Sequence, residues 1–208
     1  GEDLIFPHHE NEIAQSECCN GKRFAKYWLH NGFLNIDNKK MSKSLANFFT
    51  VREIGEKYDL QVLRFFMLSA HYRSPLNFSA ELMEASKNGL ERIRNGVDNL
   101  NHFIDVAKEK EVTQEEKEHL EKAQALALKF DEAMDDDFNT ADAVAAIFEL
   151  VKLSNTTANA ENSKAYLQQL KEKITQLSDI LGLITEKAEE MLDEDIEKMI
   201  EERQAARK

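Results

Sequence analysis

The sequence contains few of the residues that interrupt helices or cross-link a chain. Its 208 residues include only two prolines and seven glycines. Because these residues are the strongest helix breakers, their scarcity, together with long stretches of Ala, Leu, Glu and Lys, predicts a mainly helical fold. The only two cysteines, Cys18 and Cys19, are adjacent and cannot form an ordinary unstrained disulfide, which is typical of a reducing compartment.

Long hydrophobic runs are also missing. No apolar run approaches the roughly 18 residues that are needed to cross a membrane, and nothing at the start of the chain resembles a signal peptide. We therefore expect a soluble cytoplasmic protein. The length fits one large domain or two small ones.

Positive charge is scarce, with 27 Lys and Arg against 39 Asp and Glu and a net charge of −12. Residues 1–78 are close to neutral, so nearly all of the acidic excess lies after them. A protein that binds nucleic acid by bulk attraction needs a net basic surface. If RNA is a partner of this chain, local patches must bind it.

Residues 38–47, N-K-K-M-S-K-S-L-A-N, form one such patch, with three lysines and two hydroxyls. Lys40 and Lys43 stand on either side of Ser42. Because an ammonium is a compact charge on a flexible stem, the two lysines can follow a polyphosphate as negative charge builds up on it. Taken alone, the pattern is more typical of a solvated basic turn.

A second pattern, F-P-H-H-E-N-E-I-A-Q-S, occupies residues 6–16. Residues 4–6 are apolar and predict the end of a buried strand. Pro7 has a fixed φ and no N–H, which suits the first position of a helix that runs to about Asn20.

His8 and Glu12 are four residues apart in this second pattern. On a helix they share a face and can converge on one metal ion, although two ligands do not complete a site. Cys19 would lie about 16 Å from His8 along the axis, too far to share the ion. An ordinary surface pair is the alternative.

The two patterns together resemble a known family. K-M-S-K-S at residues 40–44 resembles the second signature of class I aminoacyl-tRNA synthetases, and residues 6–16 closely resemble the zinc-site helix of the cysteinyl-tRNA synthetases. With M-D-D-D-F-N-T at residues 134–140, the resemblance to this one family extends from residue 1 to the end. It implies an enzyme that joins cysteine and ATP into cysteinyl adenylate and then passes cysteine to tRNA(Cys).

The resemblance also implies the site residues. The catalytic residues would be Lys40 and Lys43, and ATP with its Mg²⁺ would be bound by these two together with Ser42, Ser44 and Asp3, the last near the ribose. His8 and Glu12 would be two ligands of Zn²⁺, and the two cysteine ligands would lie outside this chain. Zinc would select cysteine over serine because it prefers a soft thiolate. Arg64, His71 and Arg73 would be candidate contacts to the tRNA backbone, His9 either supports the zinc site or is helix surface, and Trp28 and His30 are expected to pack structurally.

Helices can be predicted along the rest of the chain. Capping boxes begin at Thr50 and Thr113, and residues 60–68 form an apolar run that predicts a buried helix. Four amphipathic stretches follow from residue 79, and the last is stopped by Gly182. The first has its apolar stripe at Leu82, Ser86, Leu90, Ile93, Val97, Leu100 and Ile104.

The predicted fold is mainly α. Residues 1–50 would be the end of a Rossmann-type nucleotide-binding catalytic domain, residues 51–78 a helical stem-contact segment, residues 79–185 a four-helix bundle that binds tRNA, and residues 186–208 the start of an anticodon-contacting region. We expect a monomer, cut at both ends and inactive by itself. Two alternatives stay open: a non-catalytic helical module that docks tRNA, and a ligase that joins cysteine to an amino sugar.

Overall fold

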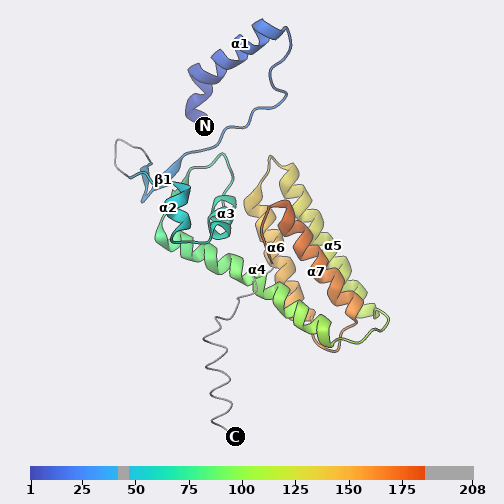
Figure 1. Ribbon diagram of the computed structural model, residues 1–208. Helices are drawn as coiled ribbons and strands as arrows, with labels where there is room; N and C mark the ends of the chain where they lie inside the picture. Colours follow the sequence, from blue (N-terminus) through green and yellow to red (C-terminus); the bar gives the residue numbers. More distant parts are fainter. Residues whose placement is uncertain (42–46, 186–208) are drawn as a thin grey trace, which may run out of the picture.

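The computed structural model describes residues 1–41 and 47–185, and within these ranges the chain is mostly helical, as predicted. Helices α4 to α7 lie side by side as a bundle, whereas helix α1 lies apart from it at the other end of the molecule (Figure 1). The short helices α2 and α3 and three short strands lie between them. No helix in the described ranges is long and apolar enough to span a membrane.

Each bundle helix begins at a polar side chain that accepts a hydrogen bond from an amide of the first turn. The helices are α4 (Ala80–Val106, capped by Ser79), α5 (Gln114–Asp135, capped by Thr113), α6 (Thr140–Thr157, capped by Asn139) and α7 (Lys164–Ile180, capped by Ser163). The caps satisfy amides that have no partner within the helix. The four predicted helices are confirmed, and after α7 the chain turns at Gly182, which has a left-handed φ of 66°.

The bundle core is built from the apolar stripes of these helices. Leu90 of α4 and Ile147 of α6 are completely buried. The stripe of α4 begins at Met83 and not at Leu82 as predicted, because Met83 is completely buried whereas Leu82 is 43% exposed. Positions 83, 86, 90, 93, 97 and 100 share one face at spacings of three and four, and Leu82 lies about 100° away from Met83 around the axis.

Helices α4 and α6 pack closely where α4 has no side chain. A Cβ atom on Gly96 would lie 2.7 Å from Cγ1 of Val151 in α6. Both residues are buried, so neither side of this contact has free space. Glycine is therefore required here for the distance between the two helices.

Helix α2 (Val51–Gly55) begins with the predicted capping box. The amide of Glu53 donates to Oγ1 of Thr50 at 3.3 Å, and the amide of Thr50 donates to Oε2 of Glu53 at 2.6 Å. The bond from the Thr50 amide to the Glu53 carboxylate, and a second one from the Thr50 hydroxyl at 2.9 Å, lower the pKa of Glu53. The reciprocal bonds set the start of the helix at Val51, as the sequence predicts.

Helix α3 (Leu60–Leu68) has the bounds predicted from its apolar sequence and connects the bundle with the sheet. Its Phe65 lies edge-on to Phe148 of α6, and its Phe66 lies edge-on to Phe78 of strand β3. Both side chains belong to the same buried cluster as the bundle residues. The hydrophobic core is therefore continuous from α3 into the bundle.

The sheet has the strand order β2-β1-β3. Strand β1 (Leu34–Ile36) pairs antiparallel with β2 (Lys39–Lys40) and parallel with β3 (Leu76–Phe78). The turn between β1 and β2 consists of Asp37 and Asn38, whose φ angles of 47° and 63° are those favoured in tight hairpins.

The predicted strand at residues 4–6 is wrong. The chain instead forms a 3-10 turn at Glu2–Leu4, a wider π-type turn at Ile5–His9 and helix α1 at Glu10–Asn20. Phe6 is 78% exposed, and no described strand pairs with this stretch. The amide of Leu4 bonds locally to Gly1, whereas that of Glu2 donates to the carbonyl of Asn31. Helix α1 thus begins at Glu10 and not at Pro7, while its predicted end near Asn20 is confirmed.

A buried carboxylate joins the starts of α5 and α7. Glu116 is only 3% exposed. Its Oε2 accepts from the amide of Thr113 and from Oγ of Ser163, both at 2.9 Å, and its Oε1 accepts from the amide of Ser163 at 2.7 Å and from Nδ2 of Asn162 at 3.1 Å. Burial by itself raises the pKa of Glu116, but the bonds from Ser163, Thr113 and Asn162 outweigh it and lower the pKa to about 2.

Candidate functional site

Two of the predicted site residues, Asp3 and Lys40, face each other. Nζ of Lys40 lies 3.9 Å from Oδ2 of Asp3 and 4.0 Å from the centre of the Phe33 ring. The side chain of Lys40 is 57% exposed and that of Asp3 is 49% exposed, so their ion pair is weak and both groups are accessible to a ligand. An ammonium beside a carboxylate suits a ligand that has both anionic groups and hydroxyl groups.

The position of Lys40 follows from the sheet. The amide of Asn38 donates to Oδ1 of Asn77 at 2.7 Å, which fastens the hairpin turn to the end of β3. After the hairpin, the amide of Met41 donates to the carbonyl of Leu34, and Nδ2 of Asn47 donates to the carbonyl of Lys40. The lysine loop, residues 40–47, is thus held through Met41 at β1 and through Asn47 at β2. Ser42, Lys43 and Ser44 lie outside the described residues.

His8 and Glu12 lie on the exposed surface around the start of α1. An imidazole nitrogen and a carboxylate oxygen are both ordinary zinc ligands, so the donor chemistry fits the predicted metal. Within residues 1–41 and 47–185, however, no group of three or more His, Cys, Asp or Glu side chains could hold a metal ion. Cys18 and Cys19 are exposed free thiols. The role of His8 and Glu12 as zinc ligands therefore stays a prediction.

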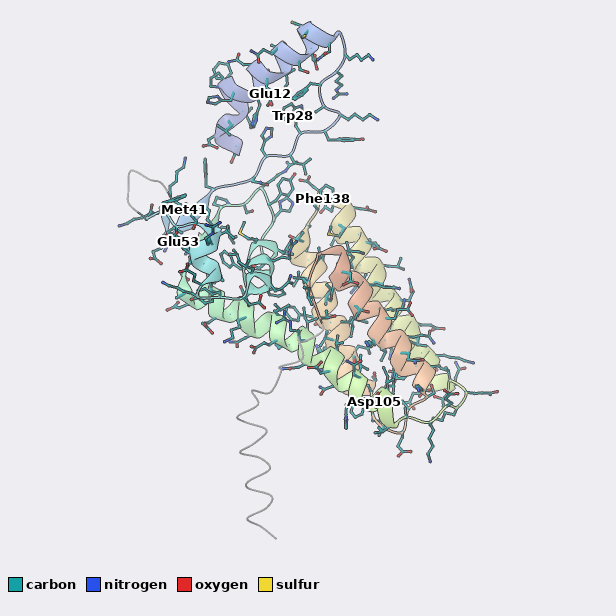
Figure 2. The ribbon with its side chains drawn as sticks, viewed as in Figure 1. Glu12, Trp28, Met41, Glu53, Asp105 and Phe138 are labelled. Carbon is teal, nitrogen blue, oxygen red and sulfur yellow. The ribbon has the colours of Figure 1, made fainter. Side chains whose placement is uncertain are left out.

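The structure brings together a ring cluster that sequence analysis did not predict. Nδ1 of His9 lies 2.9 Å from Nε2 of His30, and the Trp28 ring is nearly parallel to that of His30 at 6.0 Å. A cavity of about 220 Å³ adjoins the cluster, lined by Glu2, Ile5, Trp28, His30 and Arg73. Figure 2 shows Trp28 on the segment that returns from α1 towards the sheet. His9 and His30 are 21 positions apart, so no local pattern could reveal their contact.

Two of the candidate RNA contacts are engaged within the chain. Nε of Arg73 lies 2.8 Å from Oδ2 of Asp137, and Nε2 of His71 lies 3.8 Å from the same oxygen. Asp137 belongs to the acidic run between α5 and α6. The third candidate, Arg64, is exposed on α3. Their predicted role toward tRNA stays a prediction.

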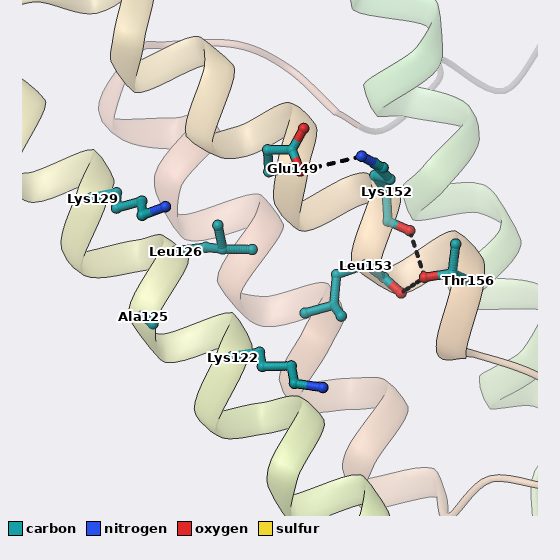
Figure 3. A pocket seen from close by; sticks show the side chains of 8 residues that line it. All are labelled: Lys122, Ala125, Leu126, Lys129, Glu149, Lys152, Leu153 and Thr156. Carbon is teal, nitrogen blue, oxygen red and sulfur yellow. Dashed lines mark hydrogen bonds and ion pairs between the residues drawn. The ribbon is translucent and has the colours of Figure 1, made fainter.

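A groove between α5 and α6 gathers lysines on the acidic bundle. Its cavity of about 400 Å³ is lined by Lys122, Ala125, Leu126, Lys129, Glu149, Lys152, Leu153 and Thr156 (Figure 3). Nζ of Lys152 lies 3.5 Å from Glu149, whereas the other two lysines have no carboxylate partner among the described residues. The groove is thus a local basic patch of the kind that an acidic protein needs to contact phosphates.

Comparisons with known proteins agree with this arrangement. The family of the class I (C) tRNA synthetase catalytic domain matches residues 1–88, and the DALR domain matches residues 129–185. The whole chain is 65% identical to a cysteine–tRNA ligase from Lachnospira eligens and 61% identical to one from Lachnoclostridium phytofermentans. It spans 44% and 45% of the lengths of these two relatives.

A solved structure has a similar fold. It is the ternary complex of LeuRS, tRNA and LeuAMS from Agrobacterium radiobacter, with a TM-score of 0.65 and 16% identity. The match covers 94% of this chain and 28% of that one. The catalytic-domain match contains Asp3, His8, Glu12 and Lys40, and the DALR match begins in α5 and contains α6 and α7. The matches therefore assign residues 1–88 to the class I (C) tRNA synthetase catalytic domain and residues 129–185 to the DALR domain.

Proposed function

We propose that this chain works as part of a cysteine–tRNA ligase, which activates cysteine with ATP to cysteinyl adenylate and transfers the cysteine to tRNA(Cys). The observation that carries the proposal is the 65% identity to such a ligase over all 208 residues. The proximity of Asp3 and Lys40 supports it, because these two residues lie far apart in the sequence yet adjoin in the fold. The working protein would be a cytoplasmic monomer.

In this proposal the lysine loop binds the triphosphate of ATP. The Lys40 ammonium, held at β2, would contact phosphate together with Lys43, Ser42 and Ser44. Charge moves onto the leaving pyrophosphate during adenylate formation, so an ammonium that meets this charge lowers the barrier. Asp3 would accept hydrogen bonds from the ribose hydroxyls, and Mg²⁺ would accompany ATP.

His8 and Glu12 would supply two of the ligands of a zinc ion, with the others outside this chain. When bound, zinc stabilises a thiolate and gives a serine hydroxyl no equivalent bond. The two side chains contribute by presenting an imidazole and a carboxylate from neighbouring turns, both exposed. His9, which follows His8 in the sequence, lies 2.9 Å from His30, and this pair would orient the start of α1.

The bundle would contact tRNA through the α5–α6 groove. Lys122, Lys129 and Lys152 would bind phosphates there, and replacing all three by glutamine should weaken tRNA binding and lower the slope of log K against log salt by roughly two to three. Lys108, Lys110 and Lys164, which lie in the loop before α5 and at the start of α7 and do not line the groove, make a charge-matched control. Equal losses in the two triple variants would exclude the groove as the contact surface.

The experiment that tests the proposed function is a chimera in which these 208 residues replace their counterpart in the Lachnospira eligens ligase. We expect cysteine-dependent exchange of pyrophosphate into ATP and charging of tRNA(Cys). Lys43→Ala should reduce kcat for exchange roughly a hundredfold with only a small change in KM for ATP, since one charge-stabilising donor contributes about 3 kcal/mol.

Lys40→Ala should have a smaller effect than Lys43→Ala, and the neighbouring Lys39→Ala is the matched control. A chimera that folds but exchanges no pyrophosphate would refute the proposed function. A rise in KM for ATP at unchanged kcat in Lys43→Ala would refute the transition-state role of the loop.

A further inference from the structure

The turn between α5 and α6 has an unusual backbone. Asp137 and Phe138 are adjacent non-glycine residues with φ angles of 54° and 56°. Such left-handed conformations cost on the order of 1 kcal/mol each and persist where surrounding contacts determine them. Figure 2 shows Phe138 at the end of the bundle that is nearer to the sheet and α1. Phe138 itself is 52% exposed, so its own packing does not account for the conformation.

Within the turn, the amides of Phe138 and Asn139 donate to the carbonyls of Met134 and Ala133, and Asp137 connects the turn to the loop between α3 and β3. Its Oδ1 accepts from the hydroxyl of Tyr72 at 2.8 Å, and its Oδ2 lies 2.8 Å from Nε of Arg73 and 3.8 Å from Nε2 of His71. Arg73 also donates from Nε to the Tyr72 hydroxyl at 2.9 Å. Beside them, Oγ1 of Thr140 lies 3.4 Å from the carbonyl of Ala70. One carboxylate therefore fixes three consecutive residues of the loop between α3 and β3.

The other side of the same loop holds the strand that leads to Lys40. The amide of Gly32 donates to the carbonyl of Tyr72 at 2.8 Å, and the amide of Leu76 donates to the carbonyl of Phe33 at 2.9 Å. A Cβ atom on Gly32 would lie 2.6 Å from the carbonyl oxygen of Ser74, so the two backbones are in direct contact. Any movement of the loop would therefore move the start of β1.

The path from this loop to the candidate site is short. Residues 34–36 of β1 pair directly with β2, which consists of Lys39 and Lys40. Phe33, whose carbonyl bonds the loop, also places its ring 4.0 Å from the Lys40 ammonium. Among the described residues, Asp137 contacts none of those predicted to bind ATP or zinc, whereas its partners His71 and Arg73 are candidate contacts to tRNA.

We propose that Asp137 is a positioning residue for the aminoacylation site: by fixing residues 71–73 it fixes β1 and, through it, Lys40. The catalytic part of this inference rests on the proposed function. The structural part is independent of it and states only that the position of residues 32–41 depends on a carboxylate of the bundle. The DALR domain would thereby set the position of Lys40 as well as contact RNA.

The structural part is tested by hydrogen exchange on the 208-residue chain. Asp137→Gly removes the carboxylate but accepts a positive φ without steric cost, so the turn keeps its backbone. We expect the amides of Gly32, Met41 and Leu76 to exchange about tenfold faster. Asp136→Gly is the matched control, because it removes the adjacent exposed carboxylate. Asp137→Asn, which keeps an acceptor and tolerates the left-handed region, should have a smaller effect.

The catalytic part is tested in the Lachnospira chimera. Asp137→Gly should lower kcat for pyrophosphate exchange by about tenfold. A substitution that has no contact with a catalytic group can still slow the reaction if it displaces that group. KM for cysteine should change by no more than a few-fold. The kcat of Asp137→Asn should lie between that of Asp137→Gly and that of the unmodified chimera. Unchanged amide exchange in Asp137→Gly would overturn the inference whatever the activity, and faster exchange with unchanged kcat would overturn the positioning role. Failure of the unmodified chimera to form adenylate would refute the proposed function alone.

Discussion

Glu116 allows a quantitative test of what holds the bundle together. Its pKa of about 2 lies well below the value of 4.5 for a free glutamate, so the folded state favours the ionised carboxylate. A difference of this size corresponds to about 3 kcal/mol of stability. The contribution is fully present above pH 4.5, where the unfolded chain also carries the charge, and is lost as the pH falls through the folded pKa of about 2.

The perturbation is Glu116→Gln. The glutamine amide would place a donor against the amide or hydroxyl donors of Thr113 and Ser163, so at neutral pH the variant should lose about 3 kcal/mol of unfolding free energy. As the pH falls from 4.5 towards 2, the parent loses its advantage and the difference between the two proteins should shrink.

The assay is urea unfolding of the 208-residue chain followed by circular dichroism at a series of pH values. Glu115→Gln is the control, because Glu115 is an exposed carboxylate in the same first turn of α5. Its difference from the parent should be small and nearly independent of pH. If the Glu116→Gln difference stayed constant from neutral pH down to acid, the hydrogen bonds to Glu116 would not depend on its charge and the reasoning would be refuted.

Three further predictions concern metal, packing and domain structure. The chain should hold no stoichiometric zinc after dialysis, measured by elemental analysis, because His8 and Glu12 are only two ligands; one tightly bound zinc per chain would show that other side chains complete the site. Gly96→Ala should destabilise the chain by about 1–3 kcal/mol in urea, and Val151→Ala should restore part of this loss if the clash is the cause. Residues 79–185 should fold alone and melt cooperatively, but at a lower temperature than residues 51–185, which retain α3; a flat melt of the shorter piece, or equal melting temperatures, would contradict the packing described here.

Helix limits could be predicted because their causes are local. Thr50 and Thr113 each begin a capping box within four residues, and α3 follows an uninterrupted apolar run. The strand predicted at residues 4–6 was wrong because an apolar triplet does not reveal whether another strand is available to pair with it.

The candidate site likewise has residues that the sequence predicts and contacts that it does not. The sequence pattern, through its resemblance to a family, selected Asp3 and Lys40, and the structure places them 3.9 Å apart, while their roles stay predictions. It did not reveal the contact of Asp137 with Tyr72, which spans 65 positions, because no short motif records a long-range bond. Such contacts depend on the packing of whole helices.

The continuous core from α3 into the bundle has a mechanical consequence. Phe65 packs against α6 and Phe66 packs against β3, so α3 connects the bundle rigidly to the sheet. We therefore expect the sheet and the bundle to move together as one rigid unit. We propose that the protein contacts tRNA at separate points, and this rigid connection would keep the distance between those points constant.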